Sequence, residues 1–599
     1  MNNQRTIYQQ AFGILARFPM LFMMLIITSF LSTLTEGIGL GVILPLIEPT
    51  IAVEYLDRVP FLSGISTWLV EMTIIERVRL IAIVLVGITL VRSLGLIAVR
   101  YVTIRLQIGA ESYLRQALFQ QIHDVEMRFI HAQSMGGLIK ALNQDVWFSI
   151  HLIREVIGMV GYFFTLAIYT VALLLLSWQL TLISGFLLLL VVTLNLYFFA
   201  QPLQKTGQEE NHYHRILSQL TTESFLAMKL IRLLRREKQR VQQFQDTFAI
   251  YELVIIRGRL LEQSIRPILS LMAVLIIAVL LFVSTLLMPM QIEILLGQIA
   301  LFLVVGFRLL DPVSKLNYAH GRVVYYTPHF EATMQFLNRA DKPYLSNGHR
   351  QFTQLATQIS LKQVTFRYHQ NEENVLADIS FDIDVGKMTA IVGRSGAGKS
   401  TLIDLISRLY DVDEGCISID GVDIRELDLT SWRTALAVVH QDILILDDTV
   451  RANLQFAKSE ATEVQLIQAA QLAQAHDFIQ ALPQGYDTIL GNRGVRLSGG
   501  QQQRIAIARA ILTDPQVLLL DEATSHLDSE TEQLFQLAIE TFRQERTMIV
   551  IAHRLSTIQT ADNIVVLDSG RVVEQGKHDE LMALCGHYWR LVEAQRLEA

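Results

Sequence analysis

The sequence predicts a chain of two parts: an all-α membrane domain of six helices with long cytoplasmic helical extensions, followed by an α/β domain. Three observations predict this fold class. Of the 599 residues, 51% are hydrophobic and 18% are charged, whereas about a quarter of the residues in soluble domains are charged. Six apolar stretches in the first half are long enough to cross a bilayer. In the second half, a glycine-rich turn joins a strand-like stretch to a helix-like one.

The membrane part is predicted from the length of its apolar stretches. A helix needs about 20 mostly apolar residues to cross a membrane. Ser177-Trp178-Gln179 separates the third stretch from the fourth, and such a short link requires adjacent antiparallel spans. The six expected spans cover residues 19–47, 80–103, 156–176, 180–200, 267–287 and 293–313.

Cationic residues predict which side of the membrane the connections face. About 50 residues lie between spans two and three and about 65 between spans four and five, and both connections are rich in Lys and Arg. Cytoplasmic connections carry an excess of these residues, so we expect the N-terminus and the second domain in the cytoplasm. Few Gly or Pro interrupt the connections, which favours helices that extend below the membrane. The expected boundaries are 1–325 for the membrane domain, 326–358 for a linker and 359–599 for the α/β domain.

Charge and cysteine content argue against several classes of function. The net charge is 50 − 57 = −7, which gives no reason to expect nucleic acid as a partner. Cys416 and Cys585 are the only cysteines, too few for a disulfide framework or a thiolate metal site.

Charged residues lie within several expected spans, among them Glu36 in the first, Arg92 in the second and Arg308 near the inner end of the sixth. A charge at membrane depth costs several kcal/mol unless it is paired or faces water. One interpretation is that Glu36 and Arg92 line a substrate path. The other is a structural ion pair, or snorkelling to the interface.

A phosphate-binding loop is predicted between the strand-like stretch 388–392 and the helix-like stretch that begins at Leu402. A glycine-rich turn of this kind aims backbone N–H groups and the positive end of a helix at one point. The spacing Gly393-x-x-x-x-Gly398-Lys399-Ser400 is that of the P-loop, in which the lysine reaches the β- and γ-phosphates and the serine hydroxyl binds Mg²⁺. The nine residues of the loop are Gly393, Arg394, Ser395, Gly396, Ala397, Gly398, Lys399, Ser400 and Thr401.

An acidic pair follows a second buried strand. Val517–Leu520 are apolar, and Asp521 and Glu522 come directly after them. Parallel sheets of α/β domains place their ligands at the carboxyl ends of the strands. We therefore expect Asp521 to hold Mg²⁺ and Glu522 to orient and deprotonate an attacking water.

A second anion site is predicted at Leu497-Ser-Gly-Gly-Gln501, where a turn of small residues leads into a helix. The N-terminus of that helix repeats the geometry of the P-loop. One domain with two separate phosphate-binding helix starts suggests a nucleotide held between two copies.

Together these motifs make the second half similar to the nucleotide-binding domain of ABC transporters. Six spans followed by one such domain resemble an ABC exporter half-transporter over nearly the whole chain. The resemblance rests on Gly393–Thr401, Gln441, Leu497–Gln501, Leu518–Glu522, Ser525–Asp528 and His553.

The resemblance implies a role for each matching residue, with ATP as the nucleotide and Mg²⁺ as its metal ion. Tyr368 would stack on the adenine, while Ser400, Gln441 and Asp521 would meet the metal. Glu522 would be the general base, and His553 and Gln441 would complete the catalytic set. Short segments near 128–138 and 222–233 would be the coupling helices. The residues that close over the nucleotide held by the partner subunit would be Ser498, Gly499, Gly500 and Gln501. Asp528 would lie on the loop that joins the two sites.

The sequence departs from the family pattern at Asn492, which lacks the charge of the more usual glutamate, and at His526, where a small residue is more common. The missing charge at Asn492 puts an ion pair with an Arg across the subunit interface in doubt. No catalytic residue is missing, which favours a homodimer.

The resemblance further implies ATP-driven export or flipping of an amphiphilic substrate across the bacterial inner membrane. The run Glu36–Pro45 is similar to exporters and flippases of lipid-linked saccharides, so a lipid-linked oligosaccharide, a glycolipid or a lipid is expected. A multidrug or peptide exporter is an alternative, and an ATP-gated channel or regulator is an alternative of another class.

Overall fold

The protein is described by a computed structural model that forms two compact units. Unit 1 comprises Met1–Asp124 and Ala132–Lys342, and unit 2 comprises Val125–His131 and Pro343–Ala599. The described residues are 2–47, 73–176, 178–287, 292–369, 373–491, 494–521, 537, 540, 546–552 and 554–598.

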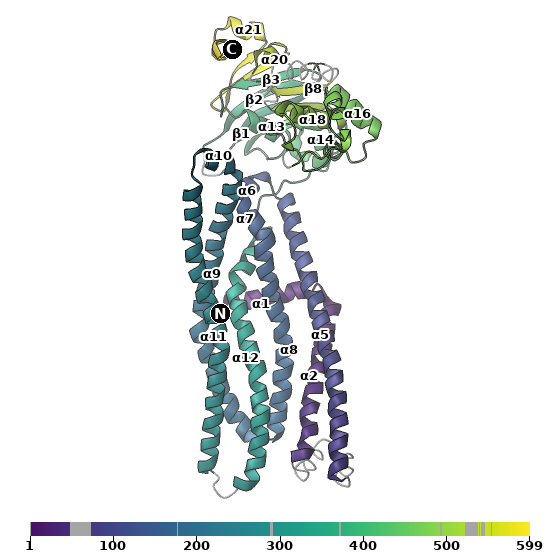
Figure 1. Cartoon of the computed structure of the whole chain (residues 1–599). Coiled ribbons are helices and arrows are strands. Elements are labelled where there is room, and N and C mark those ends of the chain that lie inside the picture. Colours follow the sequence, from purple (N-terminus) through teal and green to yellow (C-terminus); the bar gives the residue numbers. More distant parts are fainter. Residues whose placement is uncertain are drawn as a thin grey trace. The chain divides into compact units, whose positions relative to one another are not determined.

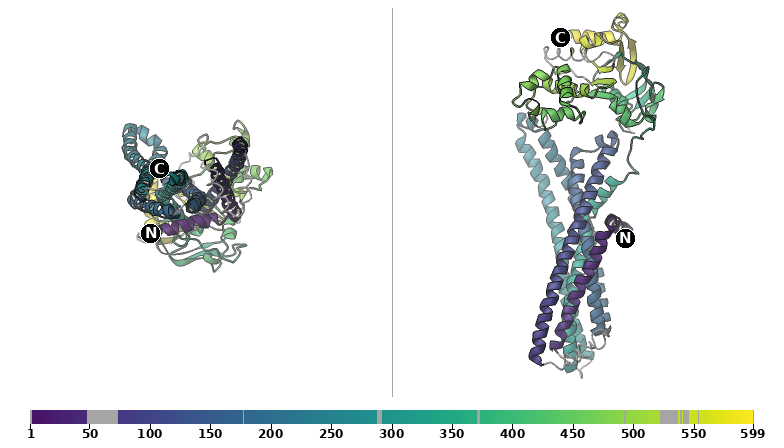
Figure 2. Two further views of the ribbon diagram at one scale, coloured as in Figure 1. Left: turned by 90° about the horizontal axis from the view of Figure 1, so that it is seen from below. Right: turned by 90° about the vertical axis from the view of Figure 1, so that its right-hand side faces the viewer.

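All secondary-structure elements in the described part of unit 1 are helices, and the long ones run beside one another as rods (Figures 1 and 2). The 51 residues of α5 extend for about 75 Å at about 1.5 Å per residue, well beyond a hydrocarbon core of about 30 Å. The expectation of long helical extensions is therefore confirmed. The helices are α1 (Asn2–Leu15), α2 (Pro19–Ile47), α5 (Ile74–Asp124), α7 (Met135–Lys140), the π-helix η1 (Ala141–Asp145), α8 (Val146–Leu176), α9 (Trp178–Leu226), α10 (Met228–Leu233), α11 (Glu237–Leu287) and α12 (Ile292–Leu337).

The number of membrane spans stays a prediction. Within the described residues, Val78–Asp124 and Met135–Leu174 are long and apolar enough to cross a membrane, and the bent pair Thr6–Leu15 and Pro19–Thr35 makes a third if it counts as one span. The other expected spans lie on α9, α11 and α12, where many side chains are outside the described residues. Helix α12 continues through Pro312 and Pro328 to Leu337, so the expected linker at 326–358 begins inside it.

Close helix packing in unit 1 depends on two glycines opposite Tyr325 of α12. A Cβ atom at Gly207 of α9 would collide with the Tyr325 carbonyl oxygen, and one at Gly258 of α11 would lie 2.9 Å from the Tyr325 ring. The Tyr325 hydroxyl, in turn, donates a hydrogen bond to Glu210 of α9. Small residues at these two positions let α9, α11 and α12 pack as one group.

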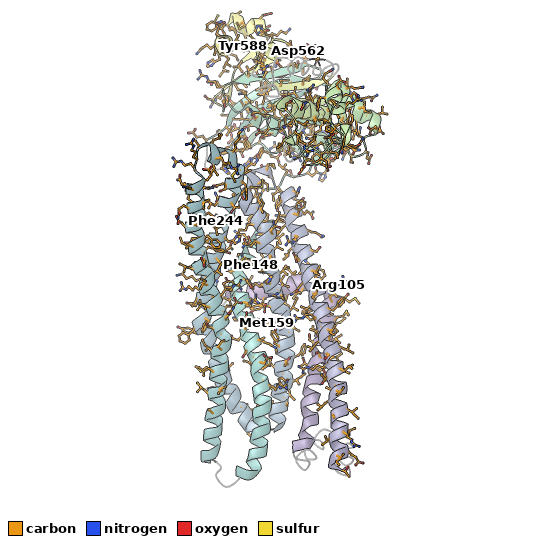
Figure 3. The ribbon with its side chains drawn as sticks, viewed as in Figure 1. Arg105, Phe148, Met159, Phe244, Asp562 and Tyr588 are labelled. Atoms are coloured by element: carbon orange, nitrogen blue, oxygen red, sulfur yellow. The ribbon has the colours of Figure 1, made fainter. Side chains whose placement is uncertain are left out.

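A buried ionic cluster joins four elements of unit 1. Lys140, at the end of α7, lies 2.6 Å from the Asp145 carboxylate and 2.6 Å from the Asn211 amide oxygen on α9. Asp145 also lies 2.8 Å from Nδ1 of His329 on α12, and the His329 ring stacks on Phe148, which Figure 3 labels on α8. The side chains of Lys140, Asp145 and His329 are each at most 6% exposed, so each depends on the others for its hydrogen bonds.

Unit 2 contains two sheets. A six-stranded sheet has the order β10-β9-β3-β8-β7-β6 and is parallel except at β10; a four-stranded antiparallel sheet has the order β2-β1-β4-β5. The expected α/β fold is confirmed, but the first two strands belong to the separate antiparallel sheet. The strands are β1 (Gln358–Phe366), β2 (Leu376–Asp384), β3 (Met388–Gly393), β4 (Glu414–Ile419), β5 (Val422–Asp423), β6 (Leu436–Val439), β7 (Val517–Asp521), β8 (Thr547–Ile551), β9 (Asn563–Asp568) and β10 (Arg571–Gly576).

Helices and short turns of unit 2 connect these strands and cover the parallel sheet (Figure 1). They are α6 (Met127–His131), α13 (Lys399–Ile406), η3 (Ile424–Glu426), α14 (Leu429–Thr434), α15 (Val450–Gln455), α16 (Glu463–Leu472), α17 (His476–Gln480), η4 (Gly485–Asp487), α18 (Gly499–Leu512), α20 (Leu555–Gln559), α21 (His578–Ala583) and α22 (His587–Glu598).

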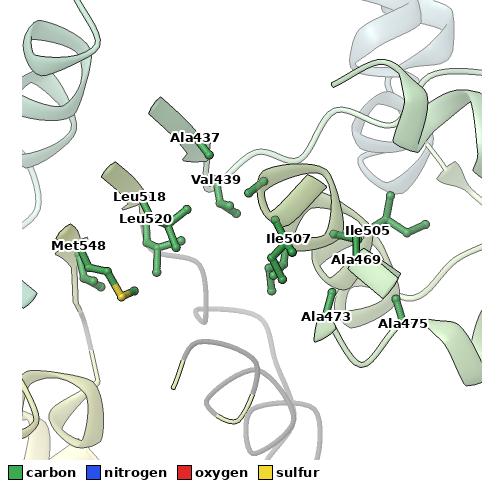
Figure 4. Packing of buried hydrophobic residues seen from close by; sticks show 14 of the residues in the cluster. Ala437, Val439, Ala469, Ala473, Ala475, Ile505, Ile507, Leu518, Leu520 and Met548 are labelled. Carbon is green, nitrogen blue, oxygen red and sulfur yellow. The ribbon is translucent and has the colours of Figure 1, made fainter. Parts of the chain in front are cut away.

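Strand β7, which lies between β8 and β6, is buried on both faces. Leu518 and Leu520 join one core, together with Ile505 and Ile507 of α18 (Figure 4). Val517 and Leu519 face the other core, which contains α13. A strand that is buried on both faces has an almost continuous run of apolar residues in its sequence, which explains why four apolar residues precede Asp521.

We predict that Lys140→Met will strongly destabilise unit 1. The substitution leaves Asp145 buried without its ammonium partner, and breaking a buried pair in this way costs about 3–5 kcal/mol. Thermal unfolding of the full chain in detergent, followed by circular dichroism, should show a clearly lower midpoint. Lys387→Met is the matched control, since the ion pair between Lys387 and Asp384 is more than half exposed on both sides. Equal midpoints for the two variants would contradict the prediction.

Candidate nucleotide-binding site

The P-loop lies between β3 and α13, as the sequence predicts. Gly398 is the residue that caps α13, with φ of 94°, and a Cβ atom there would lie 2.5 Å from the Leu376 side chain. Only glycine adopts this conformation readily and fits this space. The turn leaves the first backbone N–H groups of α13 directed into the loop, where they can donate to an anion.

Lys399 folds back over the same loop. Its side chain is 5% exposed, and Nζ donates hydrogen bonds to the carbonyl oxygens of Gly393, at 2.8 Å, and Arg394, at 3.0 Å. The ammonium therefore lies inside the ring of P-loop residues, where it adds a positive charge to the N-terminus of α13.

Ser400 and Asp521 meet although 121 positions separate them. The Ser400 hydroxyl donates a hydrogen bond of 3.2 Å to Oδ1 of Asp521. Asp521, 7% exposed, is the last residue of β7. A hydroxyl and a carboxylate offer the oxygen ligands that Mg²⁺ prefers, so this pair fits a magnesium ion bound beside the P-loop.

Gln441 follows β6 by two residues. Strand β6 pairs in parallel with β7, with Val439 opposite Leu520. Gln441 therefore leaves the sheet at the same edge as Asp521, and it is exposed there.

Tyr368 lies next to the helix of the P-loop. Its hydroxyl is 3.0 Å from Oγ1 of Thr401, and its ring packs edge-on against Phe366 and Tyr410, at 5.1 Å and 5.5 Å between centroids. Burial raises the pKa of the Tyr368 phenol, opposed by the bond to Thr401. An aromatic ring is thus held over the start of α13, close to the phosphate loop.

The turn before α18 presents a second exposed helix N-terminus. Ser498 caps α18: its Oγ accepts the Gln501 N–H, and Gln501 Oε1 accepts the Ser498 N–H. Ser498 and Gly499 are exposed, and Gly500 is partly buried. The Gln502 side chain, one residue further on, donates hydrogen bonds back to the carbonyl oxygens of Gly494, at 3.1 Å, and Leu497, at 3.4 Å.

Several predicted site residues lie outside the described residues: Glu522, Asp528, His553, Asn492 and His526. The same holds for the side chain of Glu36, although its backbone is part of α2. Arg92 is a partly buried residue of α5. The structure therefore brings together the P-loop, Tyr368 and Asp521, and places Gln441 at the same sheet edge.

Sequence reasoning missed Asp404, which shares a face of α13 with Ser400 one turn earlier. Burial and the nearby negative charge of Asp521 raise the pKa of the Asp404 carboxyl to about 6. The spacing of four residues from Ser400 was the available signal, because such residues lie above one another on a helix.

Comparison with known proteins agrees with this geometry. A family model described as "ABC transporter transmembrane region" matches residues 6–309, and one described as "ABC transporter" matches residues 376–525. The chain belongs to the ABC transporter family. The transporter thus has a helical membrane domain fused to an ATP-binding domain.

Similar proteins cover nearly the whole transporter. It is 33% identical to the heterocyst differentiation ATP-binding protein HepA of Nostoc sp., over 95% of this chain and 93% of that one. It is 31% identical to an ATP-dependent lipid A-core flippase of Alkalilimnicola ehrlichii, over 98% and 96%. The solved structure of a bacterial Atm1-family ABC exporter with ATP bound shares the fold, with a TM-score of 0.79 at 24% identity over 96% of this chain and 98% of that chain.

We predict that Asp404→Asn will stabilise the transporter in a pH-dependent way. The pKa of the Asp404 carboxyl is about 6 in the folded chain, raised from 3.8. The folded chain therefore holds this proton more tightly than the unfolded chain, and the free energy of unfolding falls as the pH rises from about 4 through about 6. The asparagine variant should therefore unfold at a higher temperature at pH 7.5, by an amount equivalent to about 1–2 kcal/mol after allowance for solvent screening.

Thermal unfolding at a series of pH values tests this expectation. The difference between Asp404→Asn and the unaltered chain should grow between pH 4 and pH 6.5 and then stay constant. Asp447→Asn, at an exposed position, is the control. A difference that does not change with pH would refute the expectation.

Proposed function

We propose that the transporter is a homodimer that uses ATP to export or flip an amphiphilic substrate. The substrate class that we propose is a lipid-linked oligosaccharide, a glycolipid or a lipid. The observation that carries the proposal is the meeting of Ser400 and Asp521 beside the buried Lys399. Asp521, 121 positions further along the chain, meets two adjacent side chains of the P-loop, and all three groups are suited to a phosphate or its metal ion.

The positions of the described residues and the resemblance to ABC transporters support a role for each residue in this proposal. Lys399 and the N–H groups of 393–401 hold the phosphates, and Tyr368 supplies an aromatic face for the adenine. Ser400, Asp521 and Gln441 hold Mg²⁺, which when bound neutralises phosphate charge. Glu522, directly after Asp521, takes the proton of the attacking water, and His553 contacts the γ-phosphate.

A second copy of the chain completes the site. The exposed turn at Ser498, Gly499, Gly500 and Gln501 ends in a helix N-terminus that can accept the phosphates held by a partner, and Asp528 lies on the loop that joins the two sites. The complete set of catalytic residues in one chain supports two equivalent sites. ATP binding closes the pair, and hydrolysis opens it again.

The substrate class is supported by the relatives of the chain and by its first span. Several relatives that share 31–33% identity over most of the chain are named lipid A-core flippases, and the run Glu36–Pro45 is similar to exporters of related amphiphiles. An inner-membrane location fits the bacterial sources of these relatives. Export of drugs or peptides remains the second candidate, because the glycine-rich first span would also suit other apolar molecules.

We predict that Glu522→Gln will abolish hydrolysis and leave ATP binding intact. Losing the general base should lower the ATPase rate by about 100-fold or more, while the phosphate contacts stay unchanged. ATPase assays and equilibrium binding on the purified full chain measure the two effects. Glu460→Gln, at an exposed position away from the site, should change neither. Unchanged hydrolysis in Glu522→Gln would overturn the assignment.

A transport experiment separates an exporter from an ATP-gated channel. In sealed vesicles an exporter moves substrate against a gradient and requires Glu522, whereas a channel only dissipates the gradient. Candidate lipids, drugs and peptides should be compared by their stimulation of the ATPase in a bilayer. We expect lipid-linked saccharides or glycolipids to stimulate, and stimulation by unrelated drugs alone would overturn the substrate class.

A further inference from the structure

Helix α6 is a part of unit 2 even though the chain on both sides of it belongs to unit 1. Its Arg128 is surrounded by acceptors: Nη1 lies 3.2 Å from Oδ1 of Asp413, Nη2 lies 3.4 Å from the Asp411 carbonyl oxygen, and Nε lies 3.4 Å from Glu126. The guanidinium also lies over the Phe366 ring, 5.0 Å from its centroid. Arg128 therefore attaches α6 to the segment that follows the P-loop helix.

Asp413 uses its other oxygen for a different part of the domain. Oδ2 accepts the backbone N–H of Arg367 at 2.8 Å, and the backbone N–H of Asp413 donates to the Thr365 carbonyl oxygen at 3.0 Å. Arg367 directly precedes Tyr368. One carboxylate thus joins Arg128 of α6 to the peptide unit next to the residue proposed to stack on the adenine.

A second connection between α6 and Tyr368 runs through Tyr410. The Tyr410 hydroxyl is 2.8 Å from Nδ1 of His131, and the Tyr410 ring, 1% exposed, packs edge-on against Tyr368 at 5.5 Å. Arg128, His131, Tyr368 and His369 also line one cavity of about 310 Å³. The side chains of α6 and the aromatic ring therefore share a common space.

We propose that Asp413 is a positioning residue for ATP, which holds the Tyr368 segment in place for the adenine and links it to α6. The inference rests on the proposed function, because it assumes that ATP binds at the P-loop with its base on Tyr368. Its physical basis is that one oxygen of the Asp413 carboxylate binds Arg128 and the other binds the backbone N–H of Arg367. A displacement of α6 that moves Arg128 would therefore also displace Asp413 and the backbone at Arg367.

The two oxygens of Asp413 suggest two variants with different outcomes. Asp413→Ala removes both acceptors and releases the Tyr368 segment. Asp413→Asn keeps an amide oxygen for the Arg367 N–H and loses the charge, which pairs with the Arg128 guanidinium at 3.2 Å and more distantly with Nε of Arg367 at 3.8 Å. If Asp413 served only general stability, Asp413→Ala would not weaken the binding of ATP selectively over that of tripolyphosphate.

The first test measures binding of ATP and of inorganic tripolyphosphate to the full chain in detergent. Stacking of a base on an aromatic ring is worth about 1–3 kcal/mol, or roughly 5- to 150-fold in Kd. Asp413→Ala should raise the Kd for ATP by about 5- to 10-fold, a part of that range, and leave the Kd for tripolyphosphate unchanged. Asp413→Asn should bind both compounds like the unaltered chain.

The second test measures hydrogen exchange at the amides of 126–131 with and without ATP. In the unaltered chain, ATP should slow exchange in α6. Asp413→Asn and Arg128→Gln should each lose this slowing, and the double variant should lose no more than either alone, because both remove the same ion pair.

Asp423→Asn is the matched control, since it also breaks an Asp–Arg pair on unit 2, with Arg425 at 2.6 Å. It should leave ATP affinity and α6 exchange unchanged. The inference is overturned if Asp413→Ala binds ATP normally, or if it loses tripolyphosphate binding equally. If the unaltered chain fails to bind ATP, or Glu522→Gln hydrolyses it normally, the proposed function itself fails.

Discussion

The parallel pairing of β3, β8 and β7 is the constraint on which the nucleotide site depends. Ile551 of β8 pairs with Ile391 of β3 on one side and with Asp521 of β7 on the other. The end of β7 therefore lies level with the residues just before the P-loop, and α13 starts within reach of Asp521. A slip of one residue in either pairing would turn the Asp521 carboxylate toward the opposite face of the sheet.

Local sequence signals predicted the parts of the site that are made by neighbouring residues. The P-loop and the strand before Asp521 each depend on a few consecutive residues with clear steric or apolar patterns. The assignment of β1 and β2 to a separate sheet was not predicted, because it depends on pairing with β4, some 50 residues away. Asp404 was missed because its environment is created by Asp521, on another strand.

The ionic cluster of unit 1 was beyond sequence reasoning for the same reason. Lys140 and Asp145 are only five positions apart, but Asn211 on α9 and His329 on α12 lie 71 positions from Lys140 and 184 positions from Asp145, and no local pattern indicates these two partners. The cluster restrains the register of α9 and α12, since a shift by one helical turn, about 5.4 Å, would leave a buried charge without its partner. The π-helix η1 places Asp145 in this cluster, directly before α8.

The membership of α6 in unit 2 bears on how the transporter can be divided. A fragment that begins after Lys342 would contain every strand of the two sheets and the whole P-loop. It would lack Met127, which packs against the core that contains Phe366, and Arg128, which lies over the Phe366 ring. It would also leave Tyr410 without the hydrogen bond to His131. Unit 2 is thus discontinuous in the sequence, and a soluble fragment that lacks residues 125–131 would leave this aromatic surface uncovered.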